Sequence, residues 1–267
     1  MGATQAELTR GAAADAGVFV CLLGGFRVFK SGVPLLVPAG GKVEQVLGYL
    51  AMHPRNGLSR EELIERVWPA SDVALAGQSL NTLSHWLKCQ LSDALSGDAP
   101  IIRRSGRCSL NTDASLKVDF LEFDAAVDLA AKQTIAGDDE GAVRSYGAAL
   151  SLYAGDLWVG SDVRQLLERE RLRAAYLTCR ARLGDHYFEA SRYDLSIHEA
   201  YELLTVDPFR EDAHRMAMRC YVRSGQRAQA MRHYQTCAEL LRAEFDAVTE
   251  PATDALYDQI RLNPGAV

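Results

Sequence analysis

The chain contains 267 residues, of which 48% are hydrophobic and 24% are charged, the ordinary composition of a folded protein with one or two domains. Its net charge of −6 argues against a general nucleic-acid binder that depends on bulk positive charge. No apolar run approaches the roughly 20 residues of a membrane-spanning helix, so we expect no membrane partner and a cytoplasmic location.

The charge is unevenly distributed along the chain. Residues 18–120 contain 11 Lys and Arg against 9 Asp and Glu, a balance of +2, whereas residues 121–267 contain 17 against 24, a balance of −7. This difference suggests that the two halves have different partners. The six cysteines are scattered without a C-x-x-C pair, which is typical of free thiols in a reducing cytoplasm rather than of a metal site or a disulfide framework.

The first half begins with a β-rich segment. Residues 1–17 are rich in Ala and Gly and predict a disordered tail. Alternating apolar residues predict a strand over Val18–Phe29, a turn at Lys30–Gly32 and a second strand over Val33–Val37. Apolar residues at helical spacing predict the first helix after Gly40-Gly41. These residues are Val43, Val46, Leu47 and Leu50.

Two further helices follow, separated by a short turn. Ser59 and Glu62 form a capping-box pattern, which predicts a helix from Arg60 to the Trp68-Pro69 pair. A third helix is predicted from Ala76 to Leu95, with one apolar and one polar face. Gln, Asn and Thr side chains can hydrogen-bond base edges in the major groove of DNA. The residues of the polar face that we expect to contact DNA are Gln78, Asn81, Thr82, His85 and Lys88.

A cationic hairpin follows the third helix. Residues 101–110 combine β-forming ends with Ser105-Gly106, a typical hairpin tip. Arg103, Arg104 and Arg107 flank this tip, and we expect them to contact phosphates or the minor groove. A helix presented to a groove and followed by a cationic hairpin is what a winged-helix DNA-binding domain needs.

The second half is predicted to be helical throughout. Periodic apolar residues predict helices over residues 121–134, 138–152, 162–190, 193–205, 210–224, 227–245 and 249–261. Small residues recur in these helices at Ala142, Ser196 and Ala230, and the last two are 34 residues apart, which is the tetratricopeptide period. Stacked repeats of this kind bury a core that no single repeat can bury alone.

Both halves resemble known bacterial modules. Residues 18–120 resemble the OmpR-type winged helix of SARP-type (antibiotic regulatory protein) transcriptional activators. The matching segments are Leu23–Val28, Ser59–Pro69, Ser79–Asn81, Leu87-Lys88 and Val118–Phe120 with Phe123. The second half resembles the bacterial transcriptional activator domain (BTAD), a tetratricopeptide-like module. Its matching segments are Tyr153–Trp158, Glu168–Leu172, Asp207–Arg215, Tyr221–Gly225 and Tyr234.

The resemblance implies an α+β winged helix over residues 18–120, followed by an all-α tetratricopeptide-like domain over residues 121–267. It further implies an activator that binds double-stranded promoter DNA, with the helical domain serving homodimerisation and contact with RNA polymerase. Family members usually carry Arg or Lys at the positions of Trp86 and Cys89. An alternative is therefore a protein-interaction module whose winged helix has weakened or lost DNA binding. A third hypothesis is control by a peptide or small effector bound to the repeats.

No enzyme, metal or cofactor site is indicated. Gly40-Gly41-Lys42 lacks the upstream glycine and the following Ser or Thr of a phosphate-binding loop. The six histidines lie on separate predicted elements without the spacing of metal ligands. We therefore expect no catalytic residues and no bound metal or cofactor.

Overall fold

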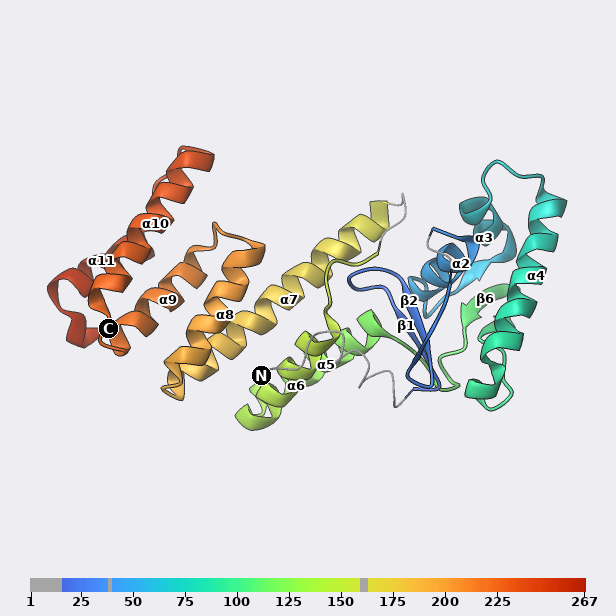
Figure 1. Ribbon diagram of the computed structural model, residues 1–267, viewed down its shortest axis with the longest axis horizontal. Coiled ribbons are helices and arrows are strands. Elements are labelled where there is room, and N and C mark those ends of the chain that lie inside the picture. Colours follow the sequence, from blue (N-terminus) through green and yellow to red (C-terminus); the bar gives the residue numbers. More distant parts are fainter. Residues whose placement is uncertain (1–15, 38–39, 159–162) are drawn as a thin grey trace. The chain divides into compact units, whose positions relative to one another are not determined.

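The structure is a computed structural model that describes residues 16–37, 40–158 and 163–267 (Figure 1). The chain divides into two compact units, each described here by itself. The first contains residues up to 128 together with 151–173, and the second contains residues 129–150 and 174–267. Of the predicted disordered tail, only Ala16 and Gly17 are among the described residues. The first unit includes part of the predicted helical half in addition to residues 18–120.

A four-stranded sheet with the order β3-β2-β1-β7 lies in the first unit. Its strands are β1 (Val18–Cys21), β2 (Arg27–Lys30), β3 (Val33–Leu35) and β7 (Leu116–Val118). β1 pairs antiparallel with β2, with Phe19 opposite Phe29, and parallel with β7, with Val20 opposite Val118. All four residues of β1 are buried, so this strand belongs to the core of the unit.

The prediction of one continuous strand over Val18–Phe29 is wrong. Residues 22–26 turn the chain between β1 and β2, and Gly24 and Gly25 have φ angles of 73° and 109°. Glycine adopts these angles without the steric cost that a Cβ atom would bring. The apolar alternation continues across this turn, so the Gly-Gly pair was the signal of the break. The second predicted strand, Val33–Val37, ends two residues early, at Leu35.

A helix-turn-helix and a second, three-stranded sheet complete the winged-helix pattern. The helices are α2 (Lys42–Ala51), α3 (Arg60–Val67) and α4 (Val73–Leu91). The strands are β4 (Leu58–Ser59), β5 (Ile101–Arg104) and β6 (Arg107–Leu110), in the order β4-β6-β5. The predicted capping box is confirmed, since the Ser59 hydroxyl accepts from the Glu62 N–H at 3.1 Å and the Glu62 carboxylate accepts from the Ser59 N–H at 2.7 Å.

Helix α4 differs from the predicted range of residues 76–95. It begins three residues earlier because the Asp72 carboxylate caps its N-terminus, accepting from the N–H groups of Ala74 and Leu75 at 2.9 and 3.1 Å. It ends at Leu91, and residues Ser92–Leu95 form a 3₁₀ turn. Asp72 was visible in the sequence as a possible cap. The predicted start was too late because the apolar residues Val73 and Leu75 are exposed and do not continue the buried face of the helix.

A buried carboxylate holds the end of β1 to the start of helix α5 (Asp119–Ile135). Asp119 is 1% exposed, and its carboxylate accepts hydrogen bonds of 2.8–2.9 Å from the N–H groups of Leu22, Leu23 and Phe120. Burial raises the pKa of Asp119 to about 6, and these three N–H donors oppose the rise. Asp119 therefore supplies the acceptors that three buried backbone groups need.

The segment Tyr153–Trp158 packs against the β1–β2 turn within the first unit. The N–H of Trp158 donates to the carbonyl of Leu22 at 2.6 Å, and Leu157 forms a bridge with Leu23. The Trp158 ring lies edge-on to Tyr49 and covers Gly48, where a Cβ atom would come within 2.5 Å of the ring. This part of the chain is thus a structural piece of the first unit.

The predicted helices of the second half are confirmed, each within two residues at its described ends. After α5 come α6 (Asp139–Leu152), α7 (Val163–Glu189), α8 (Tyr193–Val206), α9 (Glu211–Arg223), α10 (Arg227–Phe245) and α11 (Pro251–Leu262). In the second unit α9 packs against both α8 and α10 (Figure 1). Residue 162, the predicted start of α7, lies outside the described residues.

The small residues that suggested a repeat are buried between helices. Ala142 is 5% exposed, and Ser196 and Ala230 are fully buried. The Ser196 hydroxyl donates to the carbonyl of Gly184 at 2.8 Å. A Cβ atom on Gly184 would lie 2.4 Å from the sulfur of Met216, so the Met216 side chain occupies the space that the glycine leaves between α7 and α9. The tetratricopeptide-like spacing therefore has a packing cause.

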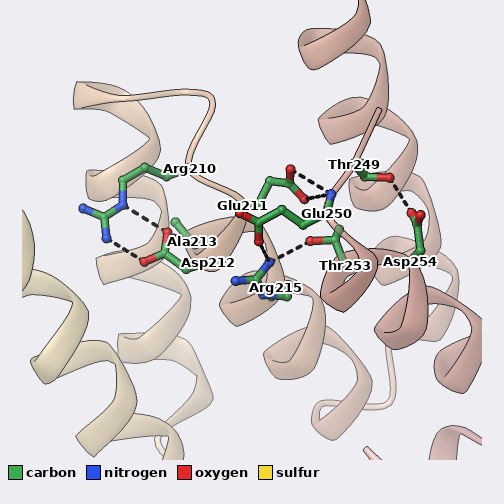
Figure 2. Close-up of polar contacts among 9 residues, drawn as sticks. All are labelled: Arg210, Glu211, Asp212, Ala213, Arg215, Thr249, Glu250, Thr253 and Asp254. Carbon is green, nitrogen blue, oxygen red and sulfur yellow. Dashed lines mark hydrogen bonds and ion pairs between the residues drawn. The ribbon is translucent and has the colours of Figure 1, made fainter. Parts of the chain in front are cut away.

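A polar network ties α11 to the start of α9 (Figure 2). The buried Glu211 carboxylate accepts from the N–H of Glu250 with both oxygens, at 2.8 and 3.0 Å. Arg215 donates to the Glu250 carboxylate at 2.7 Å and to the Thr253 hydroxyl at 2.8 Å. Glu211 and Arg215 of the Asp207–Arg215 motif therefore hold the last helix, and these two charges have a structural explanation.

Two histidines form a buried pair between α9 and α10. Nδ1 of His214 lies 3.0 Å from Nε2 of His233, and Nε2 of His214 lies 2.9 Å from the carbonyl of Pro208. The rings of Tyr201 and Tyr221 border His233 edge-on. Because Pro208 offers only an acceptor, His214 donates to it from Nε2 and accepts from His233 at Nδ1. This arrangement suits two neutral rings, and burial lowers the pKa of both histidines.

Candidate nucleic-acid interface

Helix α4 presents its predicted polar face to solvent. Ala76, Leu80, Leu87 and Leu91 are buried on the opposite side, at helical spacing, and hold the helix against the rest of the unit. The residues predicted to contact DNA are all exposed, namely Gln78, Asn81, Thr82, His85 and Lys88. The fold therefore leaves this face open to a partner.

The side chains on this face differ in how much hydrogen-bonding capacity they keep. The Thr82 hydroxyl donates to the carbonyl of Gln78 at 3.1 Å, so it offers a partner only its lone pairs. His85 Nε2 lies 3.5 Å from the sulfur of the exposed Cys89. Among the described residues, the side chains of Gln78 and Lys88 have no hydrogen-bond partner, which leaves them available for a base or a phosphate.

The hairpin β5–β6 is the predicted wing, with Ser105 and Gly106 at its tip. Their φ angles of 50° and 78° match a two-residue hairpin turn with positive φ at both positions. Arg104 pairs with Asp113 at 2.9 Å, and both side chains are 70% exposed. Such an exposed pair has little strength, so Arg104 can exchange its partner for a phosphate at small cost.

Arg107 has a different environment from the other two wing arginines. Its guanidinium donates to the carbonyls of Asn56 and Gly57 at 2.7 and 3.1 Å and to the Glu62 carboxylate at 2.9 Å. The Ser59 N–H and the positive charge of Arg107 both lower the pKa of Glu62, which keeps that carboxylate ionised at neutral pH. Arg107 therefore anchors the wing to the start of α3.

Arg103 is the wing residue that reaches helix α4. Its Nη2 lies 3.5 Å from Oδ1 of Asn81. The structure thus brings together two of the predicted DNA-contacting residues, one from the helix and one from the wing, while Arg104 and Arg107 contact residues outside the helix.

Arg60, at the first position of α3, belongs to the same cluster and was missed in the sequence. Its Nη1 donates to Oδ1 of Asn81 at 3.0 Å, and its Nη2 donates to the carbonyl of Gly77 at 2.7 Å. A Cβ atom at position 77 would lie 3.0 Å from Arg60 Nη2, so the absence of a side chain makes room for the guanidinium. A glycine inside the predicted helix was the available signal, because it pointed to a close approach.

An apolar groove of about 650 Å³ borders the polar face of α4. Trp68, Leu75, Leu83 and Trp86 line it, next to Gln78 and Thr82. Leu75 is 63% exposed and Val73, one turn before Gly77, is 70% exposed. Exposed aliphatic residues beside the half-buried rings of Trp68 and Trp86 are a typical feature of protein-binding surfaces.

Within residues 16–37, 40–158 and 163–267, no three His, Cys, Asp or Glu side chains come together as metal ligands would. None of the helices that the structure describes combines the length and apolar character that a membrane crossing requires.

The contacts of Arg107 lead to a testable distinction within the wing. Replacing Arg107 with alanine should destabilise the first unit by about 1 kcal/mol, because two carbonyls and the Glu62 carboxylate lose a donor. Arg104→Ala, on the same hairpin, should change stability by less than about 0.5 kcal/mol. Urea unfolding followed by tryptophan fluorescence measures both effects. Equal losses for the two variants would contradict the anchoring role of Arg107.

The second half matches a known family model. Residues 118–261 match the bacterial transcriptional activator domain (BTAD). The chain belongs to the BTAD family. No functionally curated protein sequence matches it significantly.

The fold of this BTAD protein is similar to that of Mycobacterium tuberculosis EmbR, solved in complex with a low-affinity phosphopeptide. The two share 21% sequence identity and a TM-score of 0.69, over 92% of this chain and 65% of the EmbR chain. The chain thus spans less than two thirds of the EmbR length. The C-terminal TPR-containing domain of a Plasmodium falciparum protein named as FK506-binding is similar at a TM-score of 0.39 and 17% identity, over 54% of this chain and 90% of that domain.

The family match and the EmbR-like fold confirm the predicted architecture, a winged helix followed by a tetratricopeptide-like BTAD. The matched family model describes a domain of bacterial transcriptional activators. The individual DNA-contacting residues remain predictions.

Proposed function

We propose that this BTAD protein is a sequence-specific transcriptional activator that inserts α4 into the major groove of promoter DNA. The observation that carries the proposal is the joint placement of an exposed polar helix face and a cationic hairpin, joined where Arg103 meets Asn81. Polar side chains on the helix suit base edges, and arginines on the hairpin suit phosphates. The resemblance to SARP-type activators supports assigning homodimerisation and RNA polymerase contact to the helical domain.

The proposal is tested by gel-shift titration of the full chain against promoter fragments at several salt concentrations. We expect at least one fragment to bind about a thousandfold more tightly than bulk DNA. Arg103→Ala should lower the magnitude of the logarithmic salt slope by about one, since one phosphate contact is lost. Arg107→Ala should lower it less, because Arg107 is already engaged inside the unit. Failure of any fragment to bind better than bulk DNA would refute the activator function.

The groove lined by Trp68 and Trp86 favours a second function, a protein-interaction module that has lost DNA binding. Family members usually carry cations at the positions of Trp86 and Cys89, which makes this helix poorer in phosphate contacts. The two functions differ in the effect of Trp86→Ala. This variant should abolish partner binding in an interaction module, whereas in a DNA reader it should leave the salt slope unchanged.

A further inference from the structure

The side-chain oxygen of Asn81 is already occupied before any partner binds. Oδ1 accepts from Arg60 Nη1 at 3.0 Å and from Arg103 Nη2 at 3.5 Å. An amide oxygen has two lone pairs and therefore accepts two such bonds. The opposite orientation of the amide would set its NH₂ group against two guanidinium groups, donor against donor, so the observed orientation is the favourable one.

The cluster of Arg60, Asn81 and Arg103 consequently offers a partner only hydrogen-bond donors. Asn81 retains both hydrogens on Nδ2, and the two guanidinium groups carry only N–H donors. Arg60 is held by a second bond, from Nη2 to the carbonyl of Gly77 at 2.7 Å, which fixes the position of its guanidinium. The donor-only character is thus built into the packing of α3 against α4.

We infer that Asn81 reads guanine rather than adenine, an inference that rests on the proposed DNA-binding function. Bidentate recognition of adenine requires an asparagine oxygen that accepts from the adenine N6 amino group while the amide nitrogen donates to N7. That oxygen is not available here. Guanine presents two acceptors in the major groove, O6 and N7, which match a cluster of donors, whereas cytosine presents a donor and is rejected. Arg60 is therefore a positioning residue that sets the specificity of Asn81.

The test uses the full chain and a pool of randomised double-stranded DNA, from which bound sequences are selected. The base pair read by Asn81 is the position of the selected DNA site at which the base preference disappears in Asn81→Ala. In the wild type this position should be guanine. In Arg60→Met one acceptor site on Asn81 becomes free, and the ratio of adenine to guanine should rise about tenfold at this position. Arg60→Lys should shift it in the same direction, because an ammonium lacks the two separate nitrogens with which Arg60 bonds the Gly77 carbonyl and Asn81.

Arg55→Met is the matched control, since it removes one charge from an exposed arginine of the same unit. It should leave the preference for guanine unchanged. Adenine at this position in the wild type, or an unchanged preference in both folded Arg60 variants, would overturn the inference while leaving the proposed function intact. Selection of no sequence at all by the wild type would refute the proposed function, and the inference with it.

Discussion

Replacing Asp119 with alanine should lower the free energy of unfolding of the first unit by about 3 kcal/mol or more. The carboxylate is 1% exposed and is the acceptor for the N–H groups of Leu22, Leu23 and Phe120. Without it three backbone donors are left buried and unpaired, and each costs about 1–3 kcal/mol. Water that partly enters the site would bring the total cost for the three donors towards about 3 kcal/mol.

Tryptophan fluorescence can follow this unit selectively. Trp68, Trp86 and Trp158 all belong to the first unit, and they account for every tryptophan in the chain. Urea unfolding of Asp119→Ala should therefore show an earlier fluorescence transition, while helical circular dichroism retains a later component from the second unit. Asp98→Ala, which alters an exposed carboxylate of the same unit, should unfold like the wild type. A loss below about 1 kcal/mol for Asp119→Ala would contradict the structural role assigned to Asp119.

Acidification should destabilise the second unit through its buried histidine pair. Burial lowers the pKa of His233 from 6.5 to about 4, and the proximity of His214 lowers it further in the same direction. Burial also lowers the pKa of His214, against a smaller opposing effect of the Pro208 carbonyl, Glu211 and Asp212. As the pH falls, the unfolded chain binds protons at these histidines at a higher pH than the folded chain does. The free energy of unfolding of the second unit therefore keeps its full value above pH 6.5 and decreases as the pH falls towards 4. His233 alone contributes about 2–3 kcal/mol to this change.

The measurement is thermal or urea unfolding monitored by helical circular dichroism across this pH range. His233→Gln removes the titrating group while its side-chain NH₂ can still donate to Nδ1 of His214, so it should flatten the pH dependence. His198→Gln changes an exposed histidine and should retain the wild-type profile. Identical pH profiles for the wild type and His233→Gln would rule out the histidine pair as the cause.

The helical half was predictable because its stabilising contacts repeat at short range. The small residues Ser196 and Ala230 recur at the repeat period, Ala142 lies at a corresponding helical position, and all three are buried. The first half was less readable. Its signals were single residues rather than periods: the Gly24-Gly25 pair marks the break within an apolar alternation, and the Asp72 cap marks the start of α4.

In the candidate site, too, features set by neighbouring residues could be predicted, whereas contacts between residues far apart in the sequence could not. Helical spacing was sufficient to place Gln78, Asn81 and Lys88 on one exposed face. The role of Arg60 was not readable, because it depends on a contact between residues 21 positions apart. Likewise, Arg104 and Arg107 are near neighbours in sequence but have different roles. The fold pairs Arg104 with the exposed Asp113, whereas it places Arg107 against the carbonyl of Asn56, and neither partner could be read from the sequence.

The packing of Leu157 and Trp158 on the β1–β2 turn limits how the chain can be truncated. A recombinant fragment that stops at residue 120 would lack the hydrogen bond from Trp158 to Leu22 and the ring that covers Gly48. It would expose apolar surface and leave the Leu22 carbonyl without its partner, which favours aggregation of the isolated fragment. A soluble winged-helix fragment should therefore extend at least through residue 158, and so include α5 and α6.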